Sequence, residues 1–465
     1  MELIKNKTFW LIIIVAILLV ISFSFIDNGS YLSLIIVAGF LLLLIFLKYS
    51  QLGIYLIAFL YPFTYLEFSY QNAFNVPYVD MLALLLFIAF FIKSLYLFFE
   101  KGQKFSWKNF PAWPFMLLFV IAAFLSLLNV EREQLLMSLK YIFRPIIFFY
   151  LMYVILPFNI IDNLKKLFTT FKVMFVLGLS ISLMGVWSII IASSTQLKRA
   201  TPTAIFGIYP LGTNQNLLAE VLICLIPFTL ILYWYEKNIF LKTIYLIGAF
   251  FFAGVNLLTL SRAGWLALIL EILILVALRY RKKAKDIMTS YLPYLGLLLI
   301  APILYLMYEL FASGFMATSN VNRLNLIELA LSLFKSHPLI GNGVGTFIPL
   351  ISQVKWYIID YGEVIDAHGF IFKTLAETGI LGTISFVLLL IYILYVLFKA
   401  FKENKNTKYS FLILGALLAA SGGIVFQLFN TSYFIGKLWL PIGLALTCLK
   451  VSKTYFIDKN KLHAE

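Results

Sequence analysis

Apolar runs, each about as long as a membrane-crossing helix, follow one another along almost the whole chain. A helix needs about 20 apolar residues to cross roughly 30 Å of bilayer hydrocarbon. Three of the runs are short enough to be re-entrant, so the pattern predicts twelve to fourteen helices. The approximate spans are 9–26, 31–47, 52–66, 78–98, 112–128, 135–156, 168–193, 215–235, 243–260, 264–279, 288–311, 380–398, 410–428 and 435–450.

The predicted fold is an all-α polytopic membrane protein with 12–14 transmembrane helices and one large loop containing short helices. We divide the chain into helices 1–11 (1–311), the large loop (312–379), and the C-terminal helices with a tail (380–465). A loop of this length in a compact protein is usually functional. No small-residue cleavage site follows the first span, so it is expected to be an uncleaved anchor.

Composition excludes several classes of protein. Charged residues make up 12% of the 465 and hydrophobic residues 62%, whereas a soluble domain carries roughly 25% charge. A soluble enzyme, a disordered chain and a disulfide scaffold are therefore excluded. Cys224 and Cys448 lie in apolar runs and are expected to be buried thiols. With three histidines, they leave little for a metal site, and no cofactor is expected.

The net charge of +15 is explained by membrane topology. With the N-terminus in the cytoplasm and the spans alternating, 25 of the 36 Lys and Arg residues face the cytoplasm, as the positive-inside rule requires. Both termini are then cytoplasmic and the loop at 312–379 lies outside. Binding to nucleic acid is not needed to explain the charge.

Two arginines that remain outside lie next to spans. Arg262 lies in a turn of about three residues between two spans. A basic residue there opposes the charge rule, and the sequence supplies no nearby acid. Anion binding is one interpretation, and a snorkelling anchor is the other. Arg199 precedes an irregular loop rich in Gly and Pro, and Asn214 or Asn216 is expected to cap the helix that follows.

Arg323 is predicted to lie in the first turn of an amphipathic helix capped by Asn320 or Asn322. The helix dipole disfavours a cation there by about 0.3–1 kcal/mol. Free backbone N–H groups and a guanidinium both suit phosphate oxygens, so an anion site is predicted. A salt bridge to a loop carboxylate is the alternative. His337, which precedes Pro338, is expected to be a structural residue at the helix end.

His368 precedes a helix that runs towards the membrane, and histidine is the natural base near neutral pH. Asp366 and Glu377 are candidate carboxylates for orienting it. A lone histidine is often structural. A functional role for His368 is favoured because it shares the outer face with the three arginines.

The remaining outer basic residues fall into two groups. In the sixth span, Lys140 and Arg144 face a partner or cavity, or else snorkel to the headgroups. The others are interpreted as solvated or interfacial charges: Arg132, Lys335, Lys355, Lys373 and Lys437.

Several motifs, taken in order, resemble those of the O-antigen ligase and polymerase superfamily. They are the turn around Arg262, Arg323 with Leu324, the segment from His337 to Gly345, His368, and the segment from Glu377 to Gly382. The stretch 206–219 resembles a further element of these proteins. The resemblance covers roughly 195–385. One departure is Gly369, where the family usually has Asn.

The resemblance implies a metal-independent membrane glycosyltransferase of GT-C-like helical architecture in the bacterial cytoplasmic membrane. Such enzymes take a glycan from an undecaprenyl-diphosphate carrier and give it to a lipid or glycan acceptor. Arg262 and Arg323, and more weakly Arg199, would bind the diphosphate, and His368 would be the base. The expected partners are therefore this donor, its acceptor and membrane lipids.

Two other functions compete. A flippase or transporter for lipid-linked oligosaccharides would use the arginines to pass a polar head group. It predicts charges in the middle of several spans, whereas the sequence has few, of which Glu271 is the clearest. A non-catalytic membrane scaffold would leave the arginines and His368 unexplained.

Overall fold

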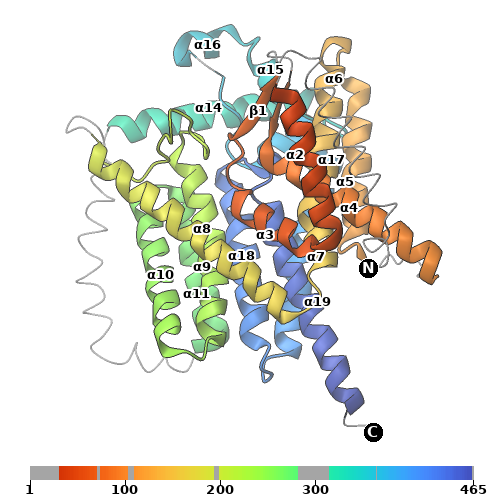
Figure 1. Cartoon of the computed structure of the whole chain (residues 1–465). Coiled ribbons are helices and arrows are strands. Elements are labelled where there is room, and N and C mark those ends of the chain that lie inside the picture. Colours follow the sequence, from red (N-terminus) through yellow and green to blue (C-terminus); the bar gives the residue numbers. More distant parts are fainter. Residues whose placement is uncertain are drawn as a thin grey trace, which may run out of the picture.

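The computed structural model describes residues 31–70, 74–102, 109–192, 198–280, 314–362 and 364–462. Helices dominate this part of the chain (Figure 1). The first half holds α2 (Tyr31–Lys48), α3 (Ser50–Leu60), α4 (Tyr78–Lys101), α5 (Trp113–Ser126), α6 (Arg132–Tyr141), α7 (Leu156–Ile160) and α8 (Leu164–Ile191). The second half holds α9 (Gln215–Tyr235), α10 (Ile239–Leu258), α11 (Arg262–Leu275), α14 (Gly314–Ser336), α15 (Phe347–Ile351), α16 (Lys355–Tyr361), α17 (Phe370–Glu403), α18 (Ser410–Phe429) and α19 (Trp439–Leu462).

Eight helical segments in these ranges are long and apolar enough to cross a bilayer, and the bent pair α2 and α3 makes a ninth if it counts as one span. Wider π-type turns around Pro145 join α6 to α7 in a single segment, and a similar turn extends α11 to Tyr280. The eight are Tyr78–Lys101, Arg132–Ile160, Leu164–Ile191, Gln215–Tyr235, Ile239–Leu258, Arg262–Tyr280, Phe370–Glu403 and Ser410–Phe429.

The predicted all-α polytopic membrane fold is confirmed. Two expected spans, 9–26 and 288–311, lie outside the described residues, and a helix occupies each of the others. The third expected span is shorter than predicted. Its helix α3 has 11 residues, about 16 Å of rise, and the chain bends by 120° between α2 and α3. These two helices therefore form a broken span or a re-entrant loop.

One short hairpin interrupts the helical pattern and was not predicted. Strands β1 (Glu67–Tyr70) and β2 (Phe74–Pro77) pair antiparallel between α3 and α4. Aromatic and β-branched residues favour this pairing, and Pro77 ends the second strand because it has no N–H to donate.

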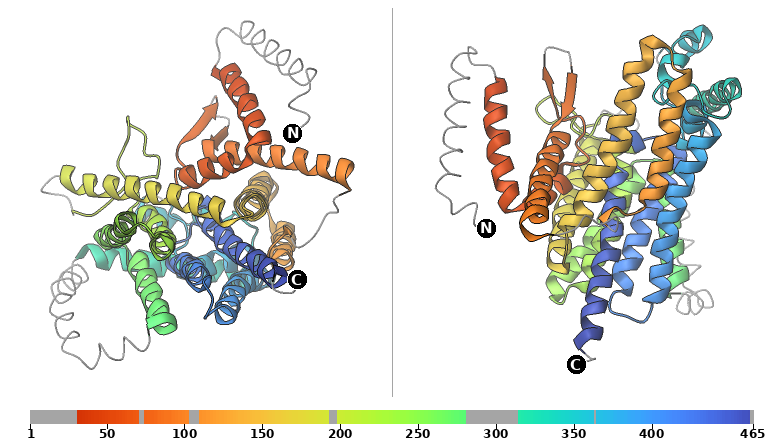
Figure 2. Two further views of the ribbon diagram at one scale, coloured as in Figure 1. Left: turned by 60° about the horizontal axis from the view of Figure 1, so that its bottom comes forward. Right: turned by 90° about the vertical axis from the view of Figure 1, so that its right-hand side faces the viewer.

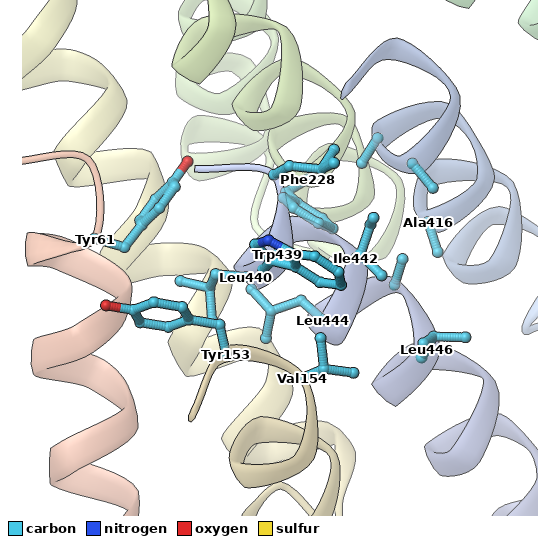
Figure 3. Packing of buried hydrophobic residues seen from close by; sticks show 14 of the residues in the cluster. Tyr61, Tyr153, Val154, Phe228, Ala416, Trp439, Leu440, Ile442, Leu444 and Leu446 are labelled. Carbon is cyan, nitrogen blue, oxygen red and sulfur yellow. The ribbon is translucent and has the colours of Figure 1, made fainter. Parts of the chain in front are cut away.

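Helices α9 and α18 form the centre of the bundle. They pack against each other, and most of each lies buried inside the protein. Helix α8 runs across α9 and α10 (Figures 1 and 2). Figure 3 shows the core around Trp439, whose indole N–H donates to the Tyr433 carbonyl at 2.9 Å while its ring stays buried. Tyr61, Tyr153 and Phe228 lie around the same cluster.

Arg144 has a partner within the bundle, which decides between the two interpretations of this residue. Its Nε and terminal nitrogen lie 2.8 and 2.7 Å from Asp80 Oδ2 on α4. The Tyr153 hydroxyl donates to Asp80 Oδ1 at 2.6 Å. A buried carboxylate needs such compensation, so this group joins α4 to the π-type turns after α6.

Candidate functional site

Helices α14, α15 and α16 and the first turns of α17 form a small folded unit at one end of the bundle, opposite the C-terminus (Figure 1). They share an apolar core of their own, which includes Leu326, Ala330, Phe347, Tyr357 and Ala376. The segment expected to be a large loop with short helices is thus mostly helical. Its largest helix, α14, has 23 residues and packs against α17.

The motif segments at 337–345 and 377–382 interlock through their backbones. Helix α17 bends at Gly379, whose φ of 62° and ψ of −163° are not helical. The bend frees two N–H groups, and Ile380 N and Leu381 N donate instead to the carbonyls of Pro338 and Leu339. Gly343 N in turn donates to Glu377 O at 2.8 Å. A helix break inside a membrane protein is tolerated when its polar groups are paired in this way.

Glycine is required where these two segments meet. A Cβ on Gly341 would lie 2.4 Å from the Glu377 carbonyl, and one on Gly379 would lie 2.5 Å from the Leu339 carbonyl. Both glycines also have positive φ, which other residues adopt only with strain. The Gly-rich segment is therefore a backbone docking surface for α17. His337, which follows the last residue of α14, has a structural contact here, since its Nδ1 lies 2.9 Å from Asn342 Oδ1.

Arg262 is the first residue of α11, at the same end of the bundle as α14. Ser261 is the N-cap, and its hydroxyl accepts from Gly264 N at 3.3 Å. The same hydroxyl donates to Asn216 Oδ1 at 2.7 Å, so α9 fixes the turn. Asn214 caps α9, because its side chain accepts from Asn216 N. The sequence had predicted either Asn214 or Asn216 as this cap.

Arg323 lies in the middle of α14, and the prediction for its helix was wrong. The helix begins at Gly314, so Arg323 is not in the first turn, and Asn320 and Asn322 are not caps. Asn322 accepts instead from the Tyr357 hydroxyl at 2.9 Å. The start was missed because the polar residues before Arg323 suit caps as well as helices. The dipole argument for an anion at this position therefore no longer applies.

The surroundings of Arg323 support an anion site on other grounds. Its Nε is buried and has no hydrogen-bond partner in the described part of the chain. Burial, with a smaller contribution from the charge of Arg262, lowers the pKa of Arg323 to about 10. The guanidinium is still charged at neutral pH and lies close enough to Arg262 to be repelled by it. Two partly buried cations held together are stabilised by an anion between them.

His368 lies within electrostatic range of both arginines. Burial lowers its pKa to about 4, Arg323 and Arg262 contribute in the same direction, and Asp366 opposes them. The imidazole is therefore neutral at pH 7, with one ring nitrogen free to accept a proton. The structure thus brings together Arg262, Arg323 and His368, three residues that lie far apart in the sequence.

The segment around His368 is held from both sides. Thr431, in the connection between α18 and α19, donates its hydroxyl to the Ala367 carbonyl. Gly369 has a φ of 96°, and a Cβ on it would lie 2.4 Å from the Leu428 carbonyl at the end of α18. This contact gives a physical reason for glycine where the resembling family usually has Asn.

The orienting role predicted for Asp366 and Glu377 stays a prediction, and the structure gives both carboxylates another partner. Both carboxylates interact with Lys373 on α17, which is 1% exposed and lies 2.7 Å from Asp366 Oδ2 and 3.4 Å from Glu377 Oε1. Glu377 Oε1 also accepts from Phe347 N at 3.2 Å. No hydrogen bond joins either carboxylate to His368 among the residues that the structure describes. They are bound to Lys373 because a buried ammonium group needs counter-charges.

Lys373 and Lys437 were predicted to be solvated or interfacial, and that prediction was wrong for both. Each is 1% exposed. The Lys373 ammonium also lies over the Phe434 ring, 4.6 Å from its centroid. Burial lowers the pKa of Lys437 to about 8, and Glu220 partly offsets this effect. Phe434 is distant from Lys373 in the sequence, and Glu220 is distant from Lys437, so no local pattern could have shown that these lysines are buried.

Arg199 lies near the turn of Arg262, but within the described part of the chain no charged group shifts its pKa. The next two residues fix its backbone: Ala200 N donates to Leu258 O at 2.8 Å, and Thr201 N donates to Ser188 Oγ at 2.9 Å. Burial alone lowers the pKa of Arg199. Its predicted contact with an anion therefore stays a prediction.

The donor atoms at this site suit an anion. In the described ranges, no group of three or more His, Cys, Asp or Glu side chains comes together as a metal site. The site presents two guanidinium groups beside a neutral imidazole. Such a set can bind a phosphate or diphosphate and accept a proton from a neighbouring hydroxyl.

Comparison with known families identifies the same region. Residues 247–387 match the family model of the O-antigen ligases, and this stretch contains Arg262, Arg323 and His368. No curated protein matches the chain. The resemblance predicted from the motifs is thus confirmed for residues 247–387, and it indicates a membrane glycan-transfer enzyme.

Proposed function

We propose that this protein transfers a glycan from an undecaprenyl-diphosphate carrier to an acceptor hydroxyl at the outer face of the cytoplasmic membrane. The observation that carries the proposal is the neutral His368 beside two partly buried arginines, within the region that matches the O-antigen ligases. The acceptor is a lipid in a ligase and another carrier-linked glycan in a polymerase.

The reaction needs two things from the protein. The leaving group is a lipid diphosphate, on which negative charge develops as the bond to the anomeric carbon breaks. Arg262 and Arg323 neutralise that charge, because a guanidinium donates two parallel hydrogen bonds to phosphate oxygens. The arginines are already in place before the reaction, so no reorganisation is needed when the charge appears.

His368 supplies the base. Its free ring nitrogen takes the proton of the acceptor hydroxyl while the hydroxyl oxygen bonds to the anomeric carbon. The bond from that carbon to the diphosphate oxygen breaks, and the bonding electrons leave with the carrier diphosphate. One displacement of this kind inverts the anomeric configuration.

The charge distribution supports the orientation. The excess of Lys and Arg on one side of the predicted spans is typical of the cytoplasmic side. In this orientation both termini are cytoplasmic, and the unit formed by α14–α16 lies outside, where carrier-linked glycans are used.

Reconstitution tests the proposal. Purified protein in liposomes is given a carrier-linked repeat unit, with and without a lipid acceptor, and the products are separated by size. Wild type should form product, whereas Arg262→Ala and Arg323→Ala should each lose about 10²–10³-fold in rate, as when an oxyanion donor is removed. A ladder of products indicates a polymerase and a single transfer indicates a ligase. Near-full activity of both alanine variants would overturn the proposal.

A further inference from the structure

Two polar side chains on one face of α9 contact the turn before α11 and the connection between α18 and α19. Asn216 and Glu220 are four residues apart, so they lie on the same side of the helix. Glu220 is 2% exposed. An ionisable group buried in a membrane protein is costly and usually has a specific partner or function.

Asn216 holds the turn that carries Arg262. The Ser261 hydroxyl donates to Asn216 Oδ1 at 2.7 Å and accepts from Gly264 N at 3.3 Å. Asn216 therefore directs the hydroxyl that caps α11. Since Arg262 is the first residue of α11, the position of its backbone depends on this contact.

Glu220 holds the connection between α18 and α19. Its Oε1 accepts from Gln427 Nε2 at 2.8 Å and from the Ser432 hydroxyl at 2.5 Å. Gln427 and Ser432 are also joined directly, because Gln427 Nε2 donates to Ser432 Oγ at 2.7 Å and Ser432 N donates to Gln427 Oε1 at 2.9 Å. All three residues are buried.

This connection in turn holds the backbone of His368. Thr431, next to Ser432, donates to the Ala367 carbonyl. Leu428, next to Gln427, places its carbonyl against Gly369. The residues on both sides of His368 are thus fixed by the segment that Glu220 anchors to α9.

We propose that α9 sets the spacing between the diphosphate site and the base, with Asn216 positioning Arg262 and Glu220 positioning His368. Both are positioning residues, because neither touches the reacting atoms. This inference rests on the proposed function. It assigns separate kinetic effects to two residues one helical turn apart, since diphosphate binding and proton removal are separate contributions.

The positioning role of Glu220 is tested by steady-state kinetics of purified variants in liposomes. Glu220→Leu should lower kcat by about 10–100-fold, the size expected for a misplaced catalytic group, and leave the donor KM unchanged. Thr431→Val, which removes only the hydrogen bond from the Thr431 hydroxyl to the Ala367 carbonyl, should also lower kcat. Glu220→Gln keeps an oxygen acceptor for Gln427 and Ser432 and should restore most of the rate.

Substitution of Asn216 should change the donor KM more than kcat. Asn216→Ala should raise the donor KM by about 5–10-fold, the scale of a weakened helix cap, with a smaller effect on kcat. Asn216→Asp keeps the acceptor oxygen for Ser261 and should rescue it.

Thr229→Val is the matched control for both residues. Thr229 is a buried polar residue on α9, but its hydroxyl donates to Leu225 O within its own helix. It should keep wild-type kinetics.

The outcomes separate this inference from the proposed function. If Arg262→Ala and His368→Ala are inactive while Thr431→Val and Glu220→Leu match Thr229→Val, the positioning role is wrong and the proposed function stands. If Glu220→Leu does not fold, Thr431→Val tests the positioning of His368 in its place. Wild-type kinetics of Thr431→Val would then overturn the positioning role of Glu220. The same fall in kcat together with the same rise in donor KM in all variants would mean that the two residues have no separate roles. That result would also contradict the inference.

Discussion

At the scale of single residues, the charge state of His368 is the property most open to measurement. The lowered pKa means that the free enzyme keeps its base form down to about pH 4, whereas an unperturbed histidine is protonated near pH 6.5. Activity that requires the neutral form is present above the pKa and is lost as the pH falls through it. We therefore expect the acidic limb of kcat/KM, which reports on the free enzyme, at about pH 4.

The limb of kcat should lie at a higher pH. A bound diphosphate neutralises the two arginines that disfavour the imidazolium, so the pKa of His368 rises in the complex with the donor. Initial rates over a range of pH and donor concentration separate the two limbs. A kcat/KM limb near pH 6.5 would show that neither burial nor the arginines lower the pKa of His368.

Arg323 should not tolerate a conservative change. Arg323→Lys keeps the charge but loses the planar group that binds two phosphate oxygens at once, so we expect rates closer to Arg323→Ala than to wild type. Lys335 on the same helix is exposed, and Lys335→Ala provides a control for charge loss alone. Full rescue by lysine would mean that Arg323 contributes only long-range charge.

At the scale of the elements, the junction between the Gly-rich segment and α17 should dominate local stability. Gly379→Ala places a methyl group 2.5 Å from the Leu339 carbonyl at a φ of 62°. The backbone conformation alone costs of order 1–3 kcal/mol, and the clash adds to it. We expect a clear drop in the thermal unfolding midpoint in detergent.

Gly362→Ala separates the two contributions. Gly362 also has a positive φ, 73°, but an added Cβ would meet nothing within 4 Å. This variant should show the conformational cost without the clash. Equal destabilisation by both substitutions would contradict the interlocking contact between 337–345 and α17.

The buried ammonium of Lys373 should be important for folding of the same junction. Lys373→Met removes the counter-charge of Asp366 and Glu377, and removing one partner of a buried ion pair typically costs about 3–5 kcal/mol. Lys355→Met on α16 is the control, since Lys355 is exposed. Unfolding in denaturant measures the difference, and equal stability of the two variants would mean that Lys373 is not ion-paired.

These elements also mark how far the sequence could be interpreted alone. The membrane spans were predictable, because apolar length is sufficient to identify them. The motif segments and the three residues Arg262, Arg323 and His368 were identified as candidates. The contacts between the segments were not predictable, because they join backbones more than thirty residues apart. The same holds for Lys373, whose burial depends on Phe434 as well as on its neighbours in α17.

At the scale of the whole molecule, the proposed orientation in the membrane rests on the charge distribution and can be tested by labelling. Cys224 and Cys448 are buried, so both can be replaced to give a cysteine-free background. Single cysteines are introduced at Ser352, which follows α15, and at Asn406, in the connection between α17 and α18, and both residues are exposed. These two segments lie at opposite ends of the bundle (Figure 1). The variants are treated with a membrane-impermeant thiol reagent. Labelling from outside at residue 352 but not at 406 is expected. The reverse pattern would place the site on the cytoplasmic side and exclude the proposed donor.

In the proposed reaction, the arginines bind the donor diphosphate while His368 performs the proton transfer. The most direct test compares donor binding with turnover in His368→Ala, alongside Arg262→Ala and His337→Ala. We expect His368→Ala to bind the carrier-linked donor as wild type does but to lose about 10²–10⁴-fold in single-turnover rate, the usual contribution of a general base. Arg262→Ala should lose donor binding, and His337→Ala should stay close to wild type because its contacts are structural. Normal turnover by His368→Ala, or loss of donor binding in it, would contradict this division of roles.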